Sequence, residues 1–127
     1  MEKKIIRSFE DLIVWQKAIE FVKQVYLITN QGDLKRDFGL RDQMRRAAVS
    51  IPTNIAEGFE RASRKEYLLF LNIAKGSAGE TRSLVRVALE VGYFNKETHD
   101  QLREGAMTIS RYLFNQIRSI RSAPARA

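Results

Sequence analysis

The chain has 127 residues, of which 44% are hydrophobic and 29% are charged, so it is long enough for one domain with a substantial core. It contains no cysteine, which excludes a disulfide framework and a thiolate metal site. No apolar segment is long enough for a signal peptide or a membrane span, and we therefore expect a cytoplasmic protein without a membrane partner. The formal net charge of +7 favours an anionic partner, most commonly nucleic acid, although such a charge can also serve solubility alone.

Residues 9–30 are predicted to form the first helix, because an apolar residue recurs there every three or four positions. Ser8 and Asp11 resemble a capping box at its start, and Gly32 with Asp33 marks its end. The apolar positions form two stripes, which are Leu12, Trp15, Ile19, Val22 and Tyr26, and Val14, Ala18, Phe21, Val25 and Ile28.

A proline interrupts the second predicted helix, which covers residues 38–61. Pro52 removes one backbone hydrogen bond and clashes with the carbonyl one turn back, at a cost of about 3 kcal/mol. The apolar positions nevertheless continue across it, at Leu40, Met44, Ala47, Ala48, Ile51, Ile55 and Phe59. We therefore expect a core helix that is kinked at Pro52 and stabilised by packing on both sides.

The third and fourth helices are predicted over residues 64–91 and 95–119. Ser63 and Glu66 have the spacing of a capping box, and Gly92 suits the left-handed position after the third helix. The fourth helix has an apolar stripe at Leu102, Ala106, Ile109, Leu113, Ile117 and Ile120.

The order of these elements predicts an all-α fold. No segment has the pattern of a strand, and short connections between long helices force neighbouring helices to run antiparallel. We expect an up-down-up-down four-helix bundle over residues 9–120, with residues 1–8 as an N-terminal arm and residues 121–127 as a frayed basic tail.

The third predicted helix carries more apolar surface than a monomeric bundle needs. Its two stripes are Tyr67, Leu71, Ala74, Ala78, Thr81, Val85 and Ala88, and Phe70, Ile73, Ser77, Leu84, Val87 and Val91. A helix on the outside of a monomeric bundle buries one face, so we expect the second stripe to contact another copy of the chain. A wide core arc is the alternative. Gly76 and Gly79 within this helix are predicted to allow a close approach between helices.

Polar residues beside Pro52 are predicted to form a structural network. Its members are Ser50, Asn54 and Glu57 of the second helix and Glu80 of the third. A carboxylate on an apolar stripe must be paired or hydrogen-bonded. We therefore expect Glu80 to meet polar groups of the second helix or an arginine, within the chain or across a contact between copies; the candidate arginines are Arg45, Arg46 and Arg82.

Positive charge is predicted to lie mainly along the flank of the bundle. Lys75, Arg82 and Arg86 fall on one outward stripe of the third helix, with the spacing of a phosphate track. The full set of candidate nucleic-acid contacts is Arg45, Arg46, Lys75, Arg82, Arg86, Arg111, Arg118 and Arg121. Neither a recognition helix nor an aromatic stacking platform is visible, so we expect contacts that tolerate sequence. A solvated face or salt bridges between copies remains the alternative.

Catalytic chemistry has little support in the sequence. His99 is the only histidine, and we expect it to face solvent near the start of the fourth helix. Glu-x-x-His motifs, which bundle metal sites use, do not occur. We therefore expect a protein that is not an enzyme, with no catalytic residue, metal, cofactor or small-molecule substrate.

Three segments combine apolar spacing with distinctive polar residues: FEDLIVWQKAIEFVKQVY, LRDQMRRAAVSIPTNIAEGFER and KGSAGETRSLVRVALEVGYF. The most distinctive part is the Ser-Ile-Pro-x-Asn-Ile-Ala-Glu-Gly run at residues 50–58, followed by the Gly-Ser-x-x-Glu run at 76–80. Over about residues 8–120 the chain resembles the bacterial four-helix-bundle proteins that are encoded within intervening sequences of 23S ribosomal RNA genes. This resemblance implies a closed homopentamer with a nucleic-acid role and no known reaction. The bundle is also similar to the accessory proteins of diversity-generating retroelements, which are basic pentamers that bind nucleic acid and a reverse transcriptase.

Three features are combined: the positive net charge, the surplus of apolar surface on the third helix and the family resemblance. Together they predict a non-catalytic, oligomeric nucleic-acid-binding module that contacts RNA or a ribonucleoprotein through its basic flank. The alternative is a protein-interaction scaffold or accessory subunit that docks an acidic partner protein, such as a reverse transcriptase. RNA binding that weakens steeply with salt would favour the first function. Capture of one protein after nuclease treatment would favour the second.

Overall fold

Four long α-helices make up most of the protein. The computed structural model describes residues 5–123, so residues 1–4 of the predicted arm and 124–127 of the predicted tail lie outside the described residues. The elements are η1 (Phe9–Asp11), α1 (Ile13–Thr29), η2 (Gly32–Arg36), α2 (Phe38–Glu60), α3 (Arg64–Glu90) and α4 (Lys96–Ser122), in which η denotes a 3-10 helix. Residues 5–123 contain no strand, and the predicted all-α class is confirmed.

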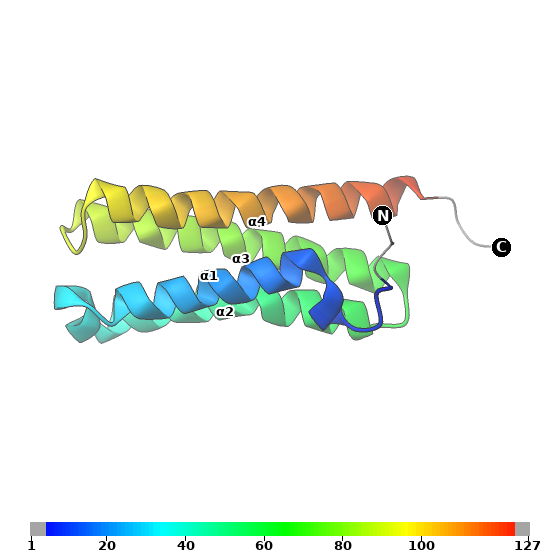
Figure 1. Ribbon diagram of the computed structural model, residues 1–127, viewed down its shortest axis with the longest axis horizontal. Coiled ribbons are helices and arrows are strands. Elements are labelled where there is room, and N and C mark those ends of the chain that lie inside the picture. Colours follow the sequence, from blue (N-terminus) through cyan, green and yellow to red (C-terminus); the bar gives the residue numbers. More distant parts are fainter. Residues whose placement is uncertain (1–4, 124–127) are drawn as a thin grey trace.

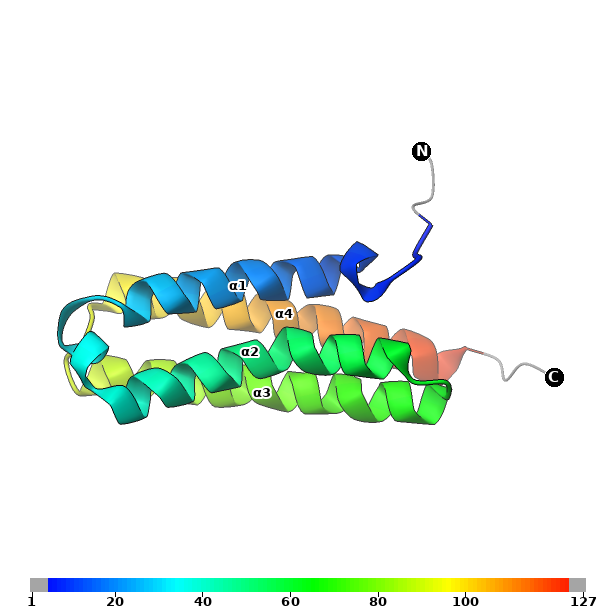
Figure 2. The same cartoon turned by 90° about the horizontal axis from the view of Figure 1, so that it is seen from below.

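The helices form an up-and-down bundle (Figure 1). The α1–α2 and α3–α4 connections lie at one end of the bundle and the α2–α3 connection lies at the other, so consecutive helices run in opposite directions (Figure 2). α1 and α3 each pack against both α2 and α4, which closes four helices around one core. The predicted four-helix bundle is therefore confirmed.

Capping residues define where two of the helical segments begin. Ser8 and Asp11 form the predicted reciprocal capping box, but this box encloses the short helix η1, and α1 begins only at Ile13. At the start of α3, the Ser63 hydroxyl accepts a hydrogen bond from the Glu66 backbone N–H at 3.1 Å. Local capping chemistry is thus sufficient to place these starts in the sequence.

The C-terminal ends of α3 and α4 differ in how closely they follow the prediction. Gly92 adopts a φ of 85° just after α3, which is the left-handed conformation expected there. α4 continues to Ser122, three residues beyond the predicted end at Ser119. Arg121 therefore belongs to the last turn of a helix and not to a frayed tail.

The core takes one stripe from each long helix. The first predicted stripe of α3 is almost entirely buried, whereas the second is divided, with Ser77 and Leu84 buried and Ile73, Val87 and Val91 exposed. The largest fully buried side chains include Leu34, Met44, Ile51, Ile55, Leu71, Leu102, Ile109 and Leu113. No helix within residues 5–123 is both long enough and apolar enough to cross a membrane.

Two glycines other than the predicted pair mark close contacts between helices. A Cβ atom on Gly58 would lie 2.7 Å from Cβ of Phe70 on α3, and one on Gly105 would lie 2.9 Å from the ring of Phe21 on α1. A Cβ atom on Gly76 or Gly79 would meet nothing within 4 Å. Within residues 5–123 the α3 glycines therefore do not make the predicted close approach between helices, and a close approach to another copy stays a prediction.

Pro52 is buried inside α2, which continues on both sides of it. Thr53 directly follows the proline, and its hydroxyl donates to the Val49 carbonyl, in the turn before the proline, at 2.8 Å. The Asn54 amide donates to the Ser50 carbonyl at 2.7 Å. These side chains supply local hydrogen bonds where the proline weakens the backbone ladder. The kink itself stays a prediction.

Candidate nucleic-acid interface

A groove runs between α3 and α4 on the outside of the bundle. Two open hollows of about 460 and 560 Å³ lie along it, and both are lined by Lys75 and Phe114. The shared residues make the hollows neighbours, so they form one continuous surface. Each volume falls within the range of sites that bind small ligands.

Five of the eight predicted nucleic-acid contacts line this groove. Lys75 and Arg82 come from α3, whereas Arg111, Arg118 and Arg121 come from α4. Residues seven positions apart lie on one helix face about 10 Å apart along the axis, so the two helices present parallel rows of cations. We call the surface formed by these five side chains and Phe114 the basic groove.

The charges of the basic groove are largely unneutralised. Neither hollow has a carboxylate among its lining residues within the described chain. Arg111 donates to Glu104 Oε1 at 2.9 Å, and Arg82 lies 2.8 Å from the sulfur of Met107. Across residues 5–123, no carboxylate forms an ion pair with Lys75, Arg82, Arg118 or Arg121. The groove therefore presents a concentrated positive field to solvent.

An exposed aromatic ring lies at the centre of the basic groove. Phe114 is 52% exposed and lines both hollows. The nearest cation, Lys75 Nζ, is 6.0 Å from its ring centroid, at the outer limit of a cation–π contact. Phe114 is thus an exposed aromatic ring in the groove, at a place where no aromatic stacking platform was expected from the sequence. Phe114 lies outside the apolar stripe of α4, and that position was the signal that the ring faces outward.

Arg86 lies one turn beyond Arg82 on α3 but does not line either hollow. Its guanidinium donates to Glu90 Oε2 at 2.9 Å, and both side chains are more than half exposed. The predicted track of three cations on α3 therefore splits into two groove residues and one residue with a local carboxylate partner.

The bundle and its motifs match one family. Residues 10–115 match the model of the 23S rRNA-intervening sequence protein. The chain belongs to the 23S rRNA-intervening sequence protein family. Its fold is similar to a crystal structure of a protein with unknown function from the S23 ribosomal protein family of Bacteroides thetaiotaomicron, with a TM-score of 0.76 and 25% identity over 83% of this chain and 98% of that chain. A comparison with curated proteins gives no match.

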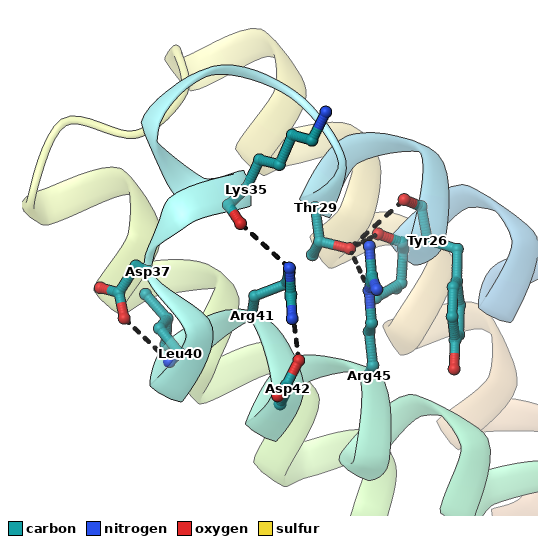
Figure 3. A network of polar contacts seen from close by, with 9 residues as sticks. Tyr26, Thr29, Lys35, Asp37, Leu40, Arg41, Asp42 and Arg45 are labelled. Atoms are coloured by element: carbon teal, nitrogen blue, oxygen red, sulfur yellow. Dashed lines mark hydrogen bonds and ion pairs between the residues drawn. The ribbon is translucent and has the colours of Figure 1, made fainter.

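In this family member, the two remaining predicted contacts lie on α2, away from the basic groove. Arg45 Nε donates to the Thr29 hydroxyl at 2.9 Å, and its guanidinium lies 4.6 Å from the centroid of the Tyr26 ring (Figure 3). The Thr29 hydroxyl in turn donates to the Val25 carbonyl at 2.7 Å. Arg45 thus ties α2 to the end of α1, while its neighbour Arg46 is exposed.

Polar contacts also organise the start of α2 in this family member. Arg41 bonds to Asp42 at 2.9 Å and to the Lys35 carbonyl at 3.1 Å (Figure 3). Asp37 caps α2 by accepting from the Leu40 N–H at 3.1 Å.

The Asp37 carboxylate has a second partner after α3. The Tyr93 hydroxyl donates to Asp37 Oδ2 at 2.7 Å. The bonds from Tyr93 and from the Leu40 N–H hold the pKa of Asp37 below its ordinary value. The same carboxylate raises the pKa of Tyr93. This end of the bundle is therefore a fixed, locally satisfied network.

The predicted polar network near Pro52 forms only in part. Asn54 donates to the Ser50 hydroxyl at 2.9 Å, and that hydroxyl lies 2.9 Å from the Ser77 hydroxyl of α3. Ser77 was not in the predicted set, although its place in the second α3 stripe made it a candidate. Glu57 instead bonds to Arg61 at 2.7 Å, one turn along α2. The network therefore consists of two serines and an asparagine between α2 and α3.

Glu80 does not join that network. It is exposed, and its side chain has no hydrogen bond or ion pair within the part of the chain that the structure describes. An ion pair with Arg82 is geometrically unfavourable, since residues two apart on a helix point to different sides. The predicted partner within the chain is therefore absent from residues 5–123, and the predicted contact with another copy is left as a proposal.

His99 is buried, which corrects the expectation that it faces solvent. It lies three and seven residues before Leu102 and Ala106 and so shares the inward stripe of α4. Its Nδ1 lies 2.8 Å from Asp100 Oδ1, and this contact, with a weaker one from Lys96, lowers the pKa of Asp100.

Proposed function

We propose that this protein is a non-catalytic nucleic-acid-binding module that holds RNA, alone or in a ribonucleoprotein, in the basic groove. The observation that carries the proposal is the set of cations there without a carboxylate partner in residues 5–123: Lys75, Arg82, Arg118 and Arg121. Phosphates neutralised by such side chains release counterions, which supplies most sequence-independent affinity. The family description refers to 23S rRNA, which makes RNA the first nucleic acid to test.

The proposed contacts favour affinity over sequence specificity. The cations of the basic groove are long side chains on the surfaces of two helices, suited to phosphate oxygens. Phosphate contacts position a nucleic acid but carry no direct sequence information. We therefore expect similar affinities for unrelated RNA sequences of equal length and structure.

We propose that the module is a homo-oligomer, and the resemblance described for its sequence favours a homopentamer. α3 carries four apolar residues that are 42–56% exposed, Leu69, Ile73, Val87 and Val91, and we call them the outer face of α3. Exposed apolar residues gathered on one helix face, here as the pairs Leu69/Ile73 and Val87/Val91, are typical of contacts between proteins. Burial of this face against another copy would leave the basic groove open, because the groove lies on the α4 side of α3.

Glu80 supports an oligomer contact on the same face. It lies seven residues after Ile73 and seven before Val87, so all three share one face of α3. A carboxylate within an apolar contact needs a partner. Since residues 5–123 of its own chain supply none, the partner in our proposal comes from a second copy.

The test of RNA binding measures the salt dependence of affinity by fluorescence anisotropy of a labelled 20-nucleotide RNA. Replacement of Arg82 and Arg118 by glutamine removes two phosphate contacts, so the slope of log K against log salt should fall by about 1.4 for a single strand. The matched control replaces the exposed Lys23 and Lys35, which lie outside the groove, and should leave the slope close to that of the wild type.

Two results would overturn the RNA proposal. One is an equal loss of slope in the groove variant and in the control, which would mean that only net charge matters. The other is the absence of RNA binding by the wild-type protein at low salt. In that case, capture of an acidic protein that resists nuclease and depends on Arg82 and Arg118 would establish the scaffold function instead.

The oligomer proposal is tested by multi-angle light scattering. We expect the wild type to have five times the single-chain mass, and the Ile73→Asp/Val87→Asp variant to dissociate while keeping its helical circular dichroism. The control Ile73→Val/Val87→Ile preserves the apolar face and should preserve the mass. A wild-type protein that is a stable single copy at micromolar concentration would refute the proposal.

A further inference from the structure

Phe114 is placed differently from Phe38, an exposed aromatic residue beside a cation at the start of α2. Phe38 is 63% exposed, and the Arg41 guanidinium lies 4.7 Å from its ring centroid. The Lys75 ammonium is farther from the Phe114 ring, at 6.0 Å from its centroid, and Phe114 lines both hollows of the groove. Its ring is therefore a largely uncovered apolar surface in a cationic groove.

The neighbours of Phe114 on α4 are spaced along a single face. Arg111 lies three residues before it and Arg118 four residues after it, about one helical turn on each side. Lys75 faces it from α3. A flat group stacked on the ring would thus have a cationic side chain of α4 on each side of it and another, from α3, across the groove.

We propose that the basic groove binds single-stranded nucleic acid, with one unpaired base stacked on Phe114 and the flanking phosphates on Lys75 and Arg118. This inference rests on the proposed function and names its ligand class. A base within a duplex is already stacked on both faces, whereas an unpaired base offers its face to an aromatic side chain. An apolar peptide would gain from the ring alone, but it would leave the surrounding cations without counter-charge.

The test compares Phe114→Leu with the wild type on labelled single-stranded U12 and on a 12-base-pair RNA duplex. Leucine keeps an apolar side chain but removes the π face, so we expect about a tenfold loss of affinity for U12. The duplex affinity and the salt slope for U12 should not change, because the phosphate contacts remain. Phe114→Trp should keep the wild-type affinity.

Phe38→Leu is the matched control, since it removes an exposed ring that lies outside the groove. It should bind U12 as the wild type does. A 2-aminopurine placed in the strand adds a direct readout, because stacking on Phe114 should quench its fluorescence and Phe114→Leu should relieve the quenching. Both substitutions are at exposed positions, and unchanged melting temperatures would verify the fold.

Unchanged U12 affinity in Phe114→Leu would overturn the stacking proposal while leaving the proposed function intact, provided that Arg82→Gln/Arg118→Gln still lowers the salt slope. Equal losses for U12 and duplex would also overturn it, because the ring would then not distinguish an unpaired base. A lower oligomer mass in Phe114→Leu would assign the ring to a contact between copies and would likewise refute it. No binding of either nucleic acid by the wild type would refute the proposed function itself.

Discussion

Arg41 and Arg45, beside the α1–α2 connection, and four of the five cations in the basic groove have opposite surroundings. Arg41 bonds to Asp42 and to a backbone carbonyl, and Arg45 bonds to Thr29 and covers the ring of Tyr26 (Figure 3). In the basic groove, Arg118 and Arg121 have no carboxylate partner within residues 5–123. One region uses arginine to join elements, and the other leaves its donors facing solvent.

This difference shows why a count of basic residues does not locate a binding surface. A carboxylate next to a guanidinium cancels most of its field, and a fixed hydroxyl or carbonyl partner occupies its donors. Unpartnered cations on two packed helices add their fields instead. Lys75, Arg82, Arg118 and Arg121 thus bring four cations without a carboxylate partner in residues 5–123 to one groove, whereas the formal charge of +7 describes the chain as a whole.

The largest expected effect on stability comes from the network beside α1. Thr29→Val removes a buried hydroxyl that accepts from Arg45 and donates to the Val25 carbonyl, with little change of shape. We expect the free energy of unfolding to fall by about 1–2 kcal/mol, measured by chemical denaturation. RNA affinity should not change.

Thr53→Val is the control for this prediction, because the Thr53 hydroxyl is exposed and bonds only to the Val49 carbonyl of its own helix. It should change stability by no more than about 0.5 kcal/mol. Equal costs for the two threonines would contradict the view that the Arg45 contact joins α1 to α2.

A smaller effect separates the arginines of the two regions directly. Arg45→Gln should lower the free energy of unfolding by about 1 kcal/mol, because it breaks the bond to Thr29. Arg118→Gln should change it by less than about 0.5 kcal/mol, since no partner within the described residues is lost. Binding should respond in the reverse order, with Arg118→Gln weakening RNA binding more than Arg45→Gln does. Stability losses of the same size at both positions would break the comparison.

The fold was predictable because its determinants are local. Apolar spacing located the four helices, and capping residues such as Ser63 and Gly92 located their ends. Pro52 does not end the helical pattern, because the apolar positions continue across it. A pattern of period 3.6 within each segment was enough to predict four packed helices.

The candidate site was less predictable because it depends on how α3 and α4 pack. Lys75 and Arg82 could be placed on one stripe from the sequence, but their meeting with Arg118 requires the relative rotation of two helices. Phe114 was not predicted to belong to the site, because its place beside Lys75 depends on the same packing of α3 against α4. His99 was wrongly expected to face solvent. Its polar neighbours in the sequence were given more weight than its helical spacing from the buried Leu102.

The smallest expected effect tests the network at the start of α2 through its pH dependence. Because the folded-state pKa of Asp37 lies below its ordinary value of 3.8, the folded protein holds a proton there less tightly than the unfolded chain does. The stability from this carboxylate is therefore fully present above the unfolded-state pKa and is lost as pH falls through the folded-state pKa.

Asp37→Asn keeps an oxygen that can cap α2 but removes the charge that accepts from the Tyr93 hydroxyl. We expect this variant to melt below the wild type at pH 6 and the difference to shrink as the pH falls below 3.8, in thermal unfolding followed by circular dichroism. Asp33→Asn is the control, because its ion pair with Arg36 is about 80% exposed on both sides and contributes little. A constant difference across this pH range would show that the Asp37 charge does not stabilise the α1–α2 end, and the contrast with the unpaired basic groove would then rest on Arg41 and Arg45 alone.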